Sequence, residues 1–209
     1  MNSVMAADQK AKLLSQAKLI SSQGLVPMSQ GNLSLRDPKS GLVVITPHDC
    51  PYEFMTIDDL VVVDLEGNVI EGSRLPSSET PVHCMVYQKR PQIFGIVHSE
   101  PIMTNVFGVI NKPILPVFVN MAIDVRGVVP IMEFAASGTK DFGCRMLDVM
   151  GKSYAVIWAN HGLLTIGETI EKAVHCTVMV EANAKIYYYA LQLGDPIVIS
   201  QDVIDHLVG

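Results

Sequence analysis

The sequence predicts an α/β fold in which a largely antiparallel sheet is flanked by helices, within a single domain spanning residues 1–209. Short apolar segments typical of strands alternate along the chain with longer helix-forming segments. Several of the short segments are joined by tight turns, which connect antiparallel rather than parallel neighbours. No linker, repeat or low-complexity stretch divides the 209 residues, which are enough for one full hydrophobic core.

The first third of the chain is predicted to form one helix and four strands. The helix runs from about residue 4 to 23, with apolar positions at helical spacing and Gly24 as its stop. Strands follow at 31–37, where polar residues alternate with leucines, and at 41–47, where a proline ends the apolar run. Residues 59–72 are predicted to form a hairpin around a Glu-Gly-Asn turn.

A helix, a strand and another helix are predicted next. Residues 77–90 favour a helix, because a serine suited to capping and a proline in the first turn begin the segment. Residues 93–100 form an apolar run typical of a buried strand, and a helix is expected from 101 to about 110. These three segments place polar residues at the ends of apolar elements.

The remaining segments complete the predicted alternation. Residues 114–134 contain only short apolar pieces and receive no helix or strand. A helix is predicted at 139–150, two strands at 154–167 that meet at Asn160-His161-Gly162, and a long final helix at 169–193. The short strands and their tight connections favour the antiparallel sheet over a doubly wound parallel one.

Composition narrows the classes of function. Hydrophobic residues make up 49% of the chain and charged residues 17%, which argues against disorder. The net charge is −6 without a basic stripe, so we expect no nucleic acid partner. No apolar run reaches the ~18 residues of a membrane span, and the N-terminus lacks the pattern of a signal peptide. We therefore expect a cytoplasmic protein with no membrane contact.

Two stretches place hydrogen-bonding groups where an anion could be held. Gly31 allows close approach of the backbone to a ligand, and Asn32 offers both a donor and an acceptor. Ser77 and Ser78 precede a helix start, whose free amides attract anions. Glu79 follows them as a candidate acid/base or metal ligand. The alternatives are an Asx turn at Asn32 and a helix-capping role for Glu79.

Two further stretches suggest a metal site. His98 and Glu100 lie two residues apart at a strand end, so their side chains are expected on the same face. His161 sits at the junction of two other strands. Two histidines and one carboxylate form a set that binds divalent transition metals with coordination positions left open. The alternative is an ordinary hydrogen-bonded pair and a structural histidine.

The motifs together resemble the class II aldolase/adducin head family, of which fuculose-1-phosphate aldolase and ribulose-5-phosphate 4-epimerase are members. The matching pieces are "GNLSLR", "ITP", "LPSSE", "IVHSE" and "NHGLLTIG", in the family's order, and the resemblance spans about residues 13 to 200. It implies a three-layer αβα arrangement with a mainly antiparallel central sheet. It also implies a homotetramer with active sites at subunit interfaces.

The resemblance also implies roles for individual residues. Glu79 matches the family's acid/base glutamate, which also approaches the metal, and His98 and His161 match metal-binding histidines. One divalent metal ion per subunit is therefore expected. The positions that match the family's phosphate-binding residues are Gly31, Asn32, Ser77 and Ser78.

The chain departs from the family pattern in three places. His98-Ser99-Glu100 replaces the common His-x-His, and we expect Glu100 to serve as the ligand in place of the second histidine. An oxygen ligand shifts the preference from Zn²⁺ toward Mn²⁺, Fe²⁺ or Co²⁺. His48-Asp49 replaces a Ser/Thr-Gly pair that binds phosphate; His48 can still contact an anion, whereas Asp49 would repel it. Around residue 119 no tyrosine matches those that the family's aldolases borrow from a neighbouring subunit.

The leading hypothesis for function is a metal-dependent aldolase. It would cleave a ketose 1-phosphate of a deoxy or modified sugar to dihydroxyacetone phosphate and an aldehyde. The same metal chemistry supports a decarboxylase or a sugar-phosphate 4-epimerase. A non-enzymatic adducin-like binding module is a further alternative, disfavoured because Glu79, His98 and His161 are all present.

Overall fold

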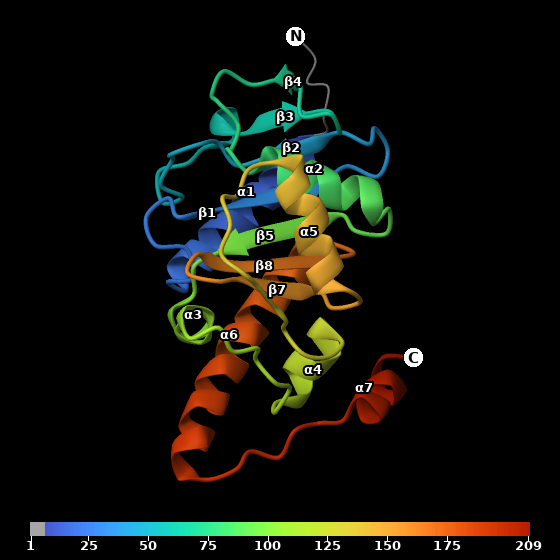
Figure 1. Cartoon of the computed structure of the whole chain (residues 1–209). Helices are drawn as coiled ribbons and strands as arrows, with labels where there is room; N and C mark the ends of the chain where they lie inside the picture. Colours follow the sequence, from blue (N-terminus) through green and yellow to red (C-terminus); the bar gives the residue numbers. More distant parts are fainter. Residues whose placement is uncertain (1–6) are drawn as a thin grey trace.

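The computed structural model describes residues 7–209 and shows three layers, with an eight-stranded sheet between two layers of helices (Figure 1). The helices are α1 (Ala7–Ser22), α2 (Thr80–Lys89), α3 (Ile102–Val109), α4 (Val119–Val125), α5 (Lys140–Met150), α6 (Ile170–Leu193), α7 (Gln201–Val208) and the short 3-10 helix η1 (Ile57–Asp59). The strands are β1 (Gly31–Arg36), β2 (Val43–Ile45), β3 (Val61–Val63), β4 (Val69–Glu71), β5 (Gly95–Ser99), β6 (Ile131–Met132), β7 (Ala155–Trp158) and β8 (Gly162–Gly167). The predicted start of the first helix at Val4 lies outside the described residues.

The sheet order is β4-β3-β2-β1-β5-β8-β7-β6. All neighbouring strands are antiparallel except β6 and β7, which pair in parallel. The prediction of an α/β fold with a mainly antiparallel sheet is confirmed. None of the helices in the described part of the chain has the length and apolar character needed to cross a membrane.

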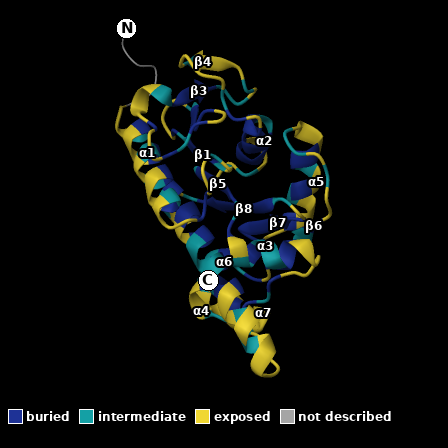
Figure 2. Ribbon diagram, turned by 90° about the vertical axis from the view of Figure 1, so that its left-hand side faces the viewer, coloured by how far each residue is buried: buried dark blue, intermediate teal, exposed yellow. Residues whose placement is uncertain are grey.

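The middle of the sheet is buried on both faces, which explains its nearly continuous apolar strands. In β2, Val43 and Ile45 belong to one core cluster and Val44 to the other. The first cluster includes residues of α2 and α5, and the second includes residues of α1 and the start of α6. Figure 2 shows the central strands buried and the outer faces of α1 and α5 exposed.

Alternation along β1 places its polar side chains on the α2 side of the sheet. Leu33 and Leu35 pack in the cluster that includes α1. Because successive side chains point to opposite faces, Asn32 and Ser34 point toward α2. The register pairs Asn32 directly with His98 of β5. The two central strands therefore bring their polar residues together below the start of α2.

The structure corrects the sequence analysis in two respects. The segment left unassigned contains α4 and the two-residue strand β6, and α7 follows the helix that was expected to be last. In addition, α2 begins later than expected, with Glu79 rather than a serine at the N-cap. The reason is local, because the Ser77 hydroxyl accepts a hydrogen bond from the Glu79 amide in a turn that precedes the helix.

Candidate metal centre

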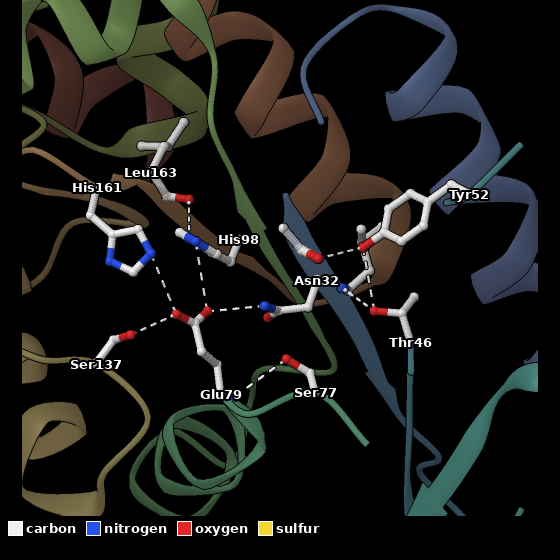
Figure 3. A network of polar contacts seen from close by, with 11 residues as sticks. Asn32, Thr46, Tyr52, Ser77, Glu79, His98, Ser137, His161 and Leu163 are labelled. Carbon is white, nitrogen blue, oxygen red and sulfur yellow. Dashed lines mark hydrogen bonds and ion pairs between the residues drawn. The ribbon is translucent and has the colours of Figure 1, made fainter. Parts of the chain in front are cut away.

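Three of the predicted metal ligands converge in one place. One ligand atom each from Glu79, His98 and His161 lies within 4.8 Å of the other two (Figure 3). The Nε2 atom of His98 lies 3.7 Å from Oε2 of Glu79, and Nε2 of His161 lies 3.6 Å from Oε1. These separations exceed a hydrogen bond, as is expected for donor atoms that surround a common ion.

His98 is fixed by contacts on two sides of its ring. It is the fourth residue of β5, and its Nδ1 lies 3.1 Å from the carbonyl oxygen of Leu163 on the neighbouring strand. The ring stacks on Trp158 with centroids 4.5 Å apart. Since Nδ1 must donate to the carbonyl, the lone pair of the neutral ring is on Nε2, which faces Glu79.

His161 lies in the tight connection between β7 and β8. Asn160 before it adopts a left-handed conformation with φ of +57°. A side chain at Gly162 would place a Cβ 2.6 Å from the Ser99 carbonyl oxygen and 2.9 Å from the His98 ring, so this position requires glycine. The close approach that results sets the His161 ring edge-on to His98, with centroids 4.9 Å apart.

Glu79 is buried, with 5% of its surface exposed, as is His98 with 2%. The Asn32 amide donates to Oε2 over 3.0 Å, and the Ser137 hydroxyl donates to Oε1 over 2.9 Å. Both oxygens thus have a side-chain donor on one side and an imidazole on the other (Figure 3).

The charge states of these groups suit a cation. Burial opposes ionisation of Glu79, but His98, the Asn32 hydrogen bond and His161 outweigh it and lower the pKa of the carboxyl. Burial and the neighbouring His98 lower the pKa of His161. A carboxylate and neutral imidazoles are the forms that bind metals. The donor set therefore fits a divalent cation such as Zn²⁺ or Mn²⁺.

The cluster lies in a cavity of about 280 Å³. Every predicted substrate-binding position lines this cavity, namely Gly31, Asn32, His48, Ser77 and Ser78. Gly31 has a φ of +142°, and a Cβ there would lie 2.6 Å from the His98 carbonyl oxygen. Only glycine allows β1 to pass this close to β5 at the cavity wall.

Glu100 and Asp49 line the same cavity but stand apart from the cluster of three ligands. Glu100 follows the last residue of β5, and burial raises the pKa of its carboxyl. Asp49 is exposed, has a φ of +48° and accepts a hydrogen bond of 3.1 Å from Ser29. The described residues that line the cavity include no lysine or arginine, so no such side chain there offsets the negative charge of a carboxylate.

Sequence reasoning missed two residues that shape the site. Ser137 comes from the irregular segment before α5, where no periodic pattern marks a functional position. Trp158 is one of four consecutive buried residues of β7, so the pattern did not show which face its ring occupies. Only the polar residues that lie next to glycines, at strand ends or at a helix start carried a signal.

Comparison with known proteins relates this fold and site to one family. The family model described as Class II Aldolase and Adducin N-terminal domain matches residues 11–188. A 5-deoxy-D-ribulose 1-phosphate aldolase of Bacillus thuringiensis serovar kurstaki is 29% identical, with 95% of this chain and 93% of the relative covered. An L-ribulose-5-phosphate 4-epimerase of Salmonella paratyphi C is 32% identical, with coverage of 80% and 78%.

A solved structure gives the same result. An L-fuculose 1-phosphate aldolase superimposes with a TM-score of 0.92 at 31% identity, and the match covers 98% of this chain and 96% of that one. The similarity therefore includes the whole arrangement of sheet and helices that surrounds the cluster.

Proposed function

The chain belongs to the class II aldolase and adducin N-terminal domain family, and from that premise we propose that it is a divalent-metal-dependent aldolase. Its substrate is a ketose 1-phosphate of a deoxy or modified sugar, cleaved to dihydroxyacetone phosphate and an aldehyde. The observation that supports this most directly is the convergence of Glu79, His98 and His161 in a cavity lined by serine hydroxyls.

Glu79, His98 and His161 hold the metal, and Glu100 is positioned on the cavity wall as a further ligand. When bound, the cation supplies Lewis-acid stabilisation of the negative charge that develops on the sugar oxygens. With Glu79 as the one anionic member of the three-residue cluster, a divalent cation would keep one positive charge for the substrate to neutralise, and an ionised Glu100 would reduce that charge further.

Glu79 is the proposed acid/base. Cleavage of the bond between carbons 3 and 4 leaves its electron pair on carbon 3, which then takes up a proton. The hydroxyl on carbon 4 loses its proton as the aldehyde forms. Glu79 begins as a carboxylate, takes up a proton equivalent to the one released by the carbon 4 hydroxyl, and delivers it to carbon 3; the donors on Asn32 and Ser137 fix its carboxylate for this step.

The phosphate lies against Ser77 and Ser78 and the glycine-containing turn at Gly31 and Asn32, with His48 at the rim. All five residues line the cavity. The hydroxyls and amides of these segments supply neutral donors for the phosphate oxygens. The 5-deoxy-D-ribulose 1-phosphate aldolase among the relatives supports a deoxy sugar as the remainder of the substrate.

The chain also forms a homotetramer in this proposal, with active sites at subunit interfaces. The C-terminal half of α6 extends past the sheet (Figure 1). Its exposed apolar side chains include Ile186, Leu191 and Leu193. Apolar surface of this kind is typical of protein interfaces. Light scattering tests this directly, with an expected mass four times the 22.8 kDa of one chain.

The second candidate is a sugar-phosphate 4-epimerase, because the similarity to the Salmonella epimerase is of the same order as that to the aldolases. Both reactions begin with cleavage of the bond between carbons 3 and 4. The aldolase releases the aldehyde, whereas the epimerase rotates and rejoins it. A metal-dependent decarboxylase uses the same donors, and an adducin-like binding module has no use for them.

The deciding experiment incubates purified, metal-loaded protein with a panel of ketose 1-phosphates and with ketopentose 5-phosphates. The aldolase releases dihydroxyacetone phosphate, detected by a coupled reduction, and the epimerase interconverts pentose phosphates without it. Metal analysis and removal by chelation accompany the assay. A protein that binds neither Mn²⁺ nor Zn²⁺ and cleaves no member of the panel would refute the proposal.

A further inference from the structure

A second set of buried polar side chains lies directly behind Glu79 and Asn32. The Ser34 hydroxyl is 2.7 Å from Nδ1 of His83 and 2.8 Å from the Tyr87 hydroxyl. Ser34 and His83 are 0% exposed, and Tyr87 is 1% exposed. Since burying unpaired polar groups is costly, this cluster is expected to be fully hydrogen-bonded.

The geometry relates this cluster to the metal centre. Asn32 and Ser34 project from the same face of β1, two residues apart, while Glu79 and His83 are four residues apart at the start of α2. The contacts Asn32–Glu79 and Ser34–His83 are therefore successive bridges between the same strand and the same helix.

The proton positions in the cluster follow from counting donors. Burial raises the pKa of Tyr87, so its hydroxyl keeps its proton, and Ser34 is the acceptor that the described residues offer it. Ser34 must then give its own proton to Nδ1 of His83. Burial lowers the pKa of His83 to about 3, so the ring is neutral and its one proton is on Nε2.

After these assignments, one buried donor and one buried acceptor near the cluster still need partners. Within residues 7–209, Nε2 of His83 and Oδ1 of Asn32 are both buried without a hydrogen-bond partner. The bridges to Glu79 and His83 start from Asn32 and Ser34, which are same-face neighbours on β1 and therefore roughly 6.6 Å apart along the strand. One water with two ordinary hydrogen bonds spans roughly 5.5 Å and satisfies such a pair.

We infer that His83 is a positioning residue for Glu79, and that its Nε2–H and Oδ1 of Asn32 share one buried water. The water completes a chain of hydrogen bonds from Tyr87 through Ser34, His83 and Asn32 to the Glu79 carboxylate. Each member donates to the next, so the chain holds the Asn32 amide with its nitrogen toward Glu79. Without it, the amide is free to rotate and turn its oxygen toward the carboxylate.

The inference rests on the proposed function, in which Glu79 is a metal ligand and the acid/base and must therefore be held in place. Its test uses no substrate, so a failed aldolase assay leaves it standing. The first measurement is a high-resolution crystal structure of the unaltered protein. A water within hydrogen-bond distance of both atoms is expected, and clear density without one overturns the inference.

The second measurement compares metal affinity among three variants by competition with a chelating dye. His83→Leu is expected to weaken Zn²⁺ binding about tenfold, as is usual when support of a ligand is removed. His83→Gln keeps a donor and is expected to stay within about threefold of the unaltered protein. Unchanged affinity in His83→Leu, or equal loss in both variants, contradicts a role for the Nε2 donor.

Thr165→Val is the matched control. It also removes a buried hydroxyl of the sheet, which lies 2.6 Å from Thr177 and outside the cavity. If the metal affinity depends on sheet stability alone, Thr165→Val weakens it as much as His83→Leu at a similar melting temperature, and the inference fails.

Discussion

Two glutamates of this protein contact the starts of helices, and their surroundings differ: Glu79 is the N-cap of α2, whereas Glu181 lies in the middle of α6 and reaches the start of α3. Glu181 of α6 accepts hydrogen bonds of 2.8 Å from the backbone amides of Met103 and Thr104 and from the Thr104 hydroxyl. Glu79 at the start of α2 is held instead by the side chains of Asn32 and Ser137. Glu181 thus satisfies free amides of α3, as a structural cap does.

The difference separates the carboxylate to which we assign the proposed chemistry from one with a structural role. Both carboxylate oxygens of Glu181 accept hydrogen bonds from the start of α3. Each oxygen of Glu79 also lies within 3.7 Å of an imidazole nitrogen, in a cavity open to a ligand. A carboxylate held by side chains beside unused donor atoms is arranged for chemistry, and its replacement should affect turnover rather than folding.

The largest effect is expected for Glu79→Gln. Glutamine keeps an oxygen that can contact the metal and the Asn32 amide, but it cannot carry a proton at neutral pH. We expect the rate of aldehyde release to fall about 1,000-fold, within the usual range for a general acid/base. The measurement is kcat at saturating metal, with the metal content determined on the same sample.

The matched control is Glu181→Gln, which should retain the full rate. A Glu79→Gln enzyme within a factor of ten of the unaltered rate would remove Glu79 from the proton transfer and leave it as a metal ligand only.

The converse effect is expected for Glu181→Ala. Its loss leaves the amides of Met103 and Thr104 without their acceptor, which costs roughly 1–3 kcal/mol of unfolding free energy. Thermal and urea unfolding at one fixed protein concentration measure this cost. Because the side chain is outside the cavity, kcat should not change. A large loss of kcat without loss of stability would show that the two glutamates do not differ as described.

Glu100→Ala tests whether a third carboxylate belongs with Glu79. Glu100 lines the cavity but lies outside the cluster of three ligands. If it completes the metal site, its removal should weaken Mn²⁺ binding about tenfold. Glu53→Ala, which removes an exposed carboxylate outside this cavity, is the control. Equal affinity in both variants would show that another group supplies the ligand.

The fold class and the convergence of Glu79, His98 and His161 could be predicted from the sequence because both leave a local pattern. Alternating or continuous apolar residues indicate strands that are buried on one or on both faces, and His98 and His161 lie where such strands end. Gly31 and Asn32 were candidates because glycine permits close approach of the backbone and the amide offers both a donor and an acceptor. These signals depend on near neighbours in the chain.

What the sequence could not show depends on contacts between distant segments. Ser137 reaches Glu79 across 58 positions from an irregular segment, and β6 is only two residues long. The helix α4 has seven residues, too few for a periodic pattern to stand out. The proton order from Tyr87 to Asn32 required knowing which buried atoms have partners.

Asp49→Asn is expected to give the smallest effect and tests the rim of the cavity. Asp49 is exposed beside the proposed phosphate position, and its charge should repel an anion. Asparagine tolerates the left-handed conformation at φ +48° and can still accept from Ser29. Solvent screening limits the gain, so inhibition by dihydroxyacetone phosphate should become about threefold tighter.

The gain should shrink as the salt concentration rises, because a screened charge acts over less than about 10 Å at 0.1 M salt. Asp58→Asn removes an equally exposed charge outside the cavity and should change nothing. If Asp49→Asn instead weakens inhibition, Asp49 holds the ligand through a hydrogen bond. The anionic end of the substrate would then lie elsewhere, while the assignment of Glu79 would still stand, because its contacts with Asn32 and the imidazoles do not involve the rim.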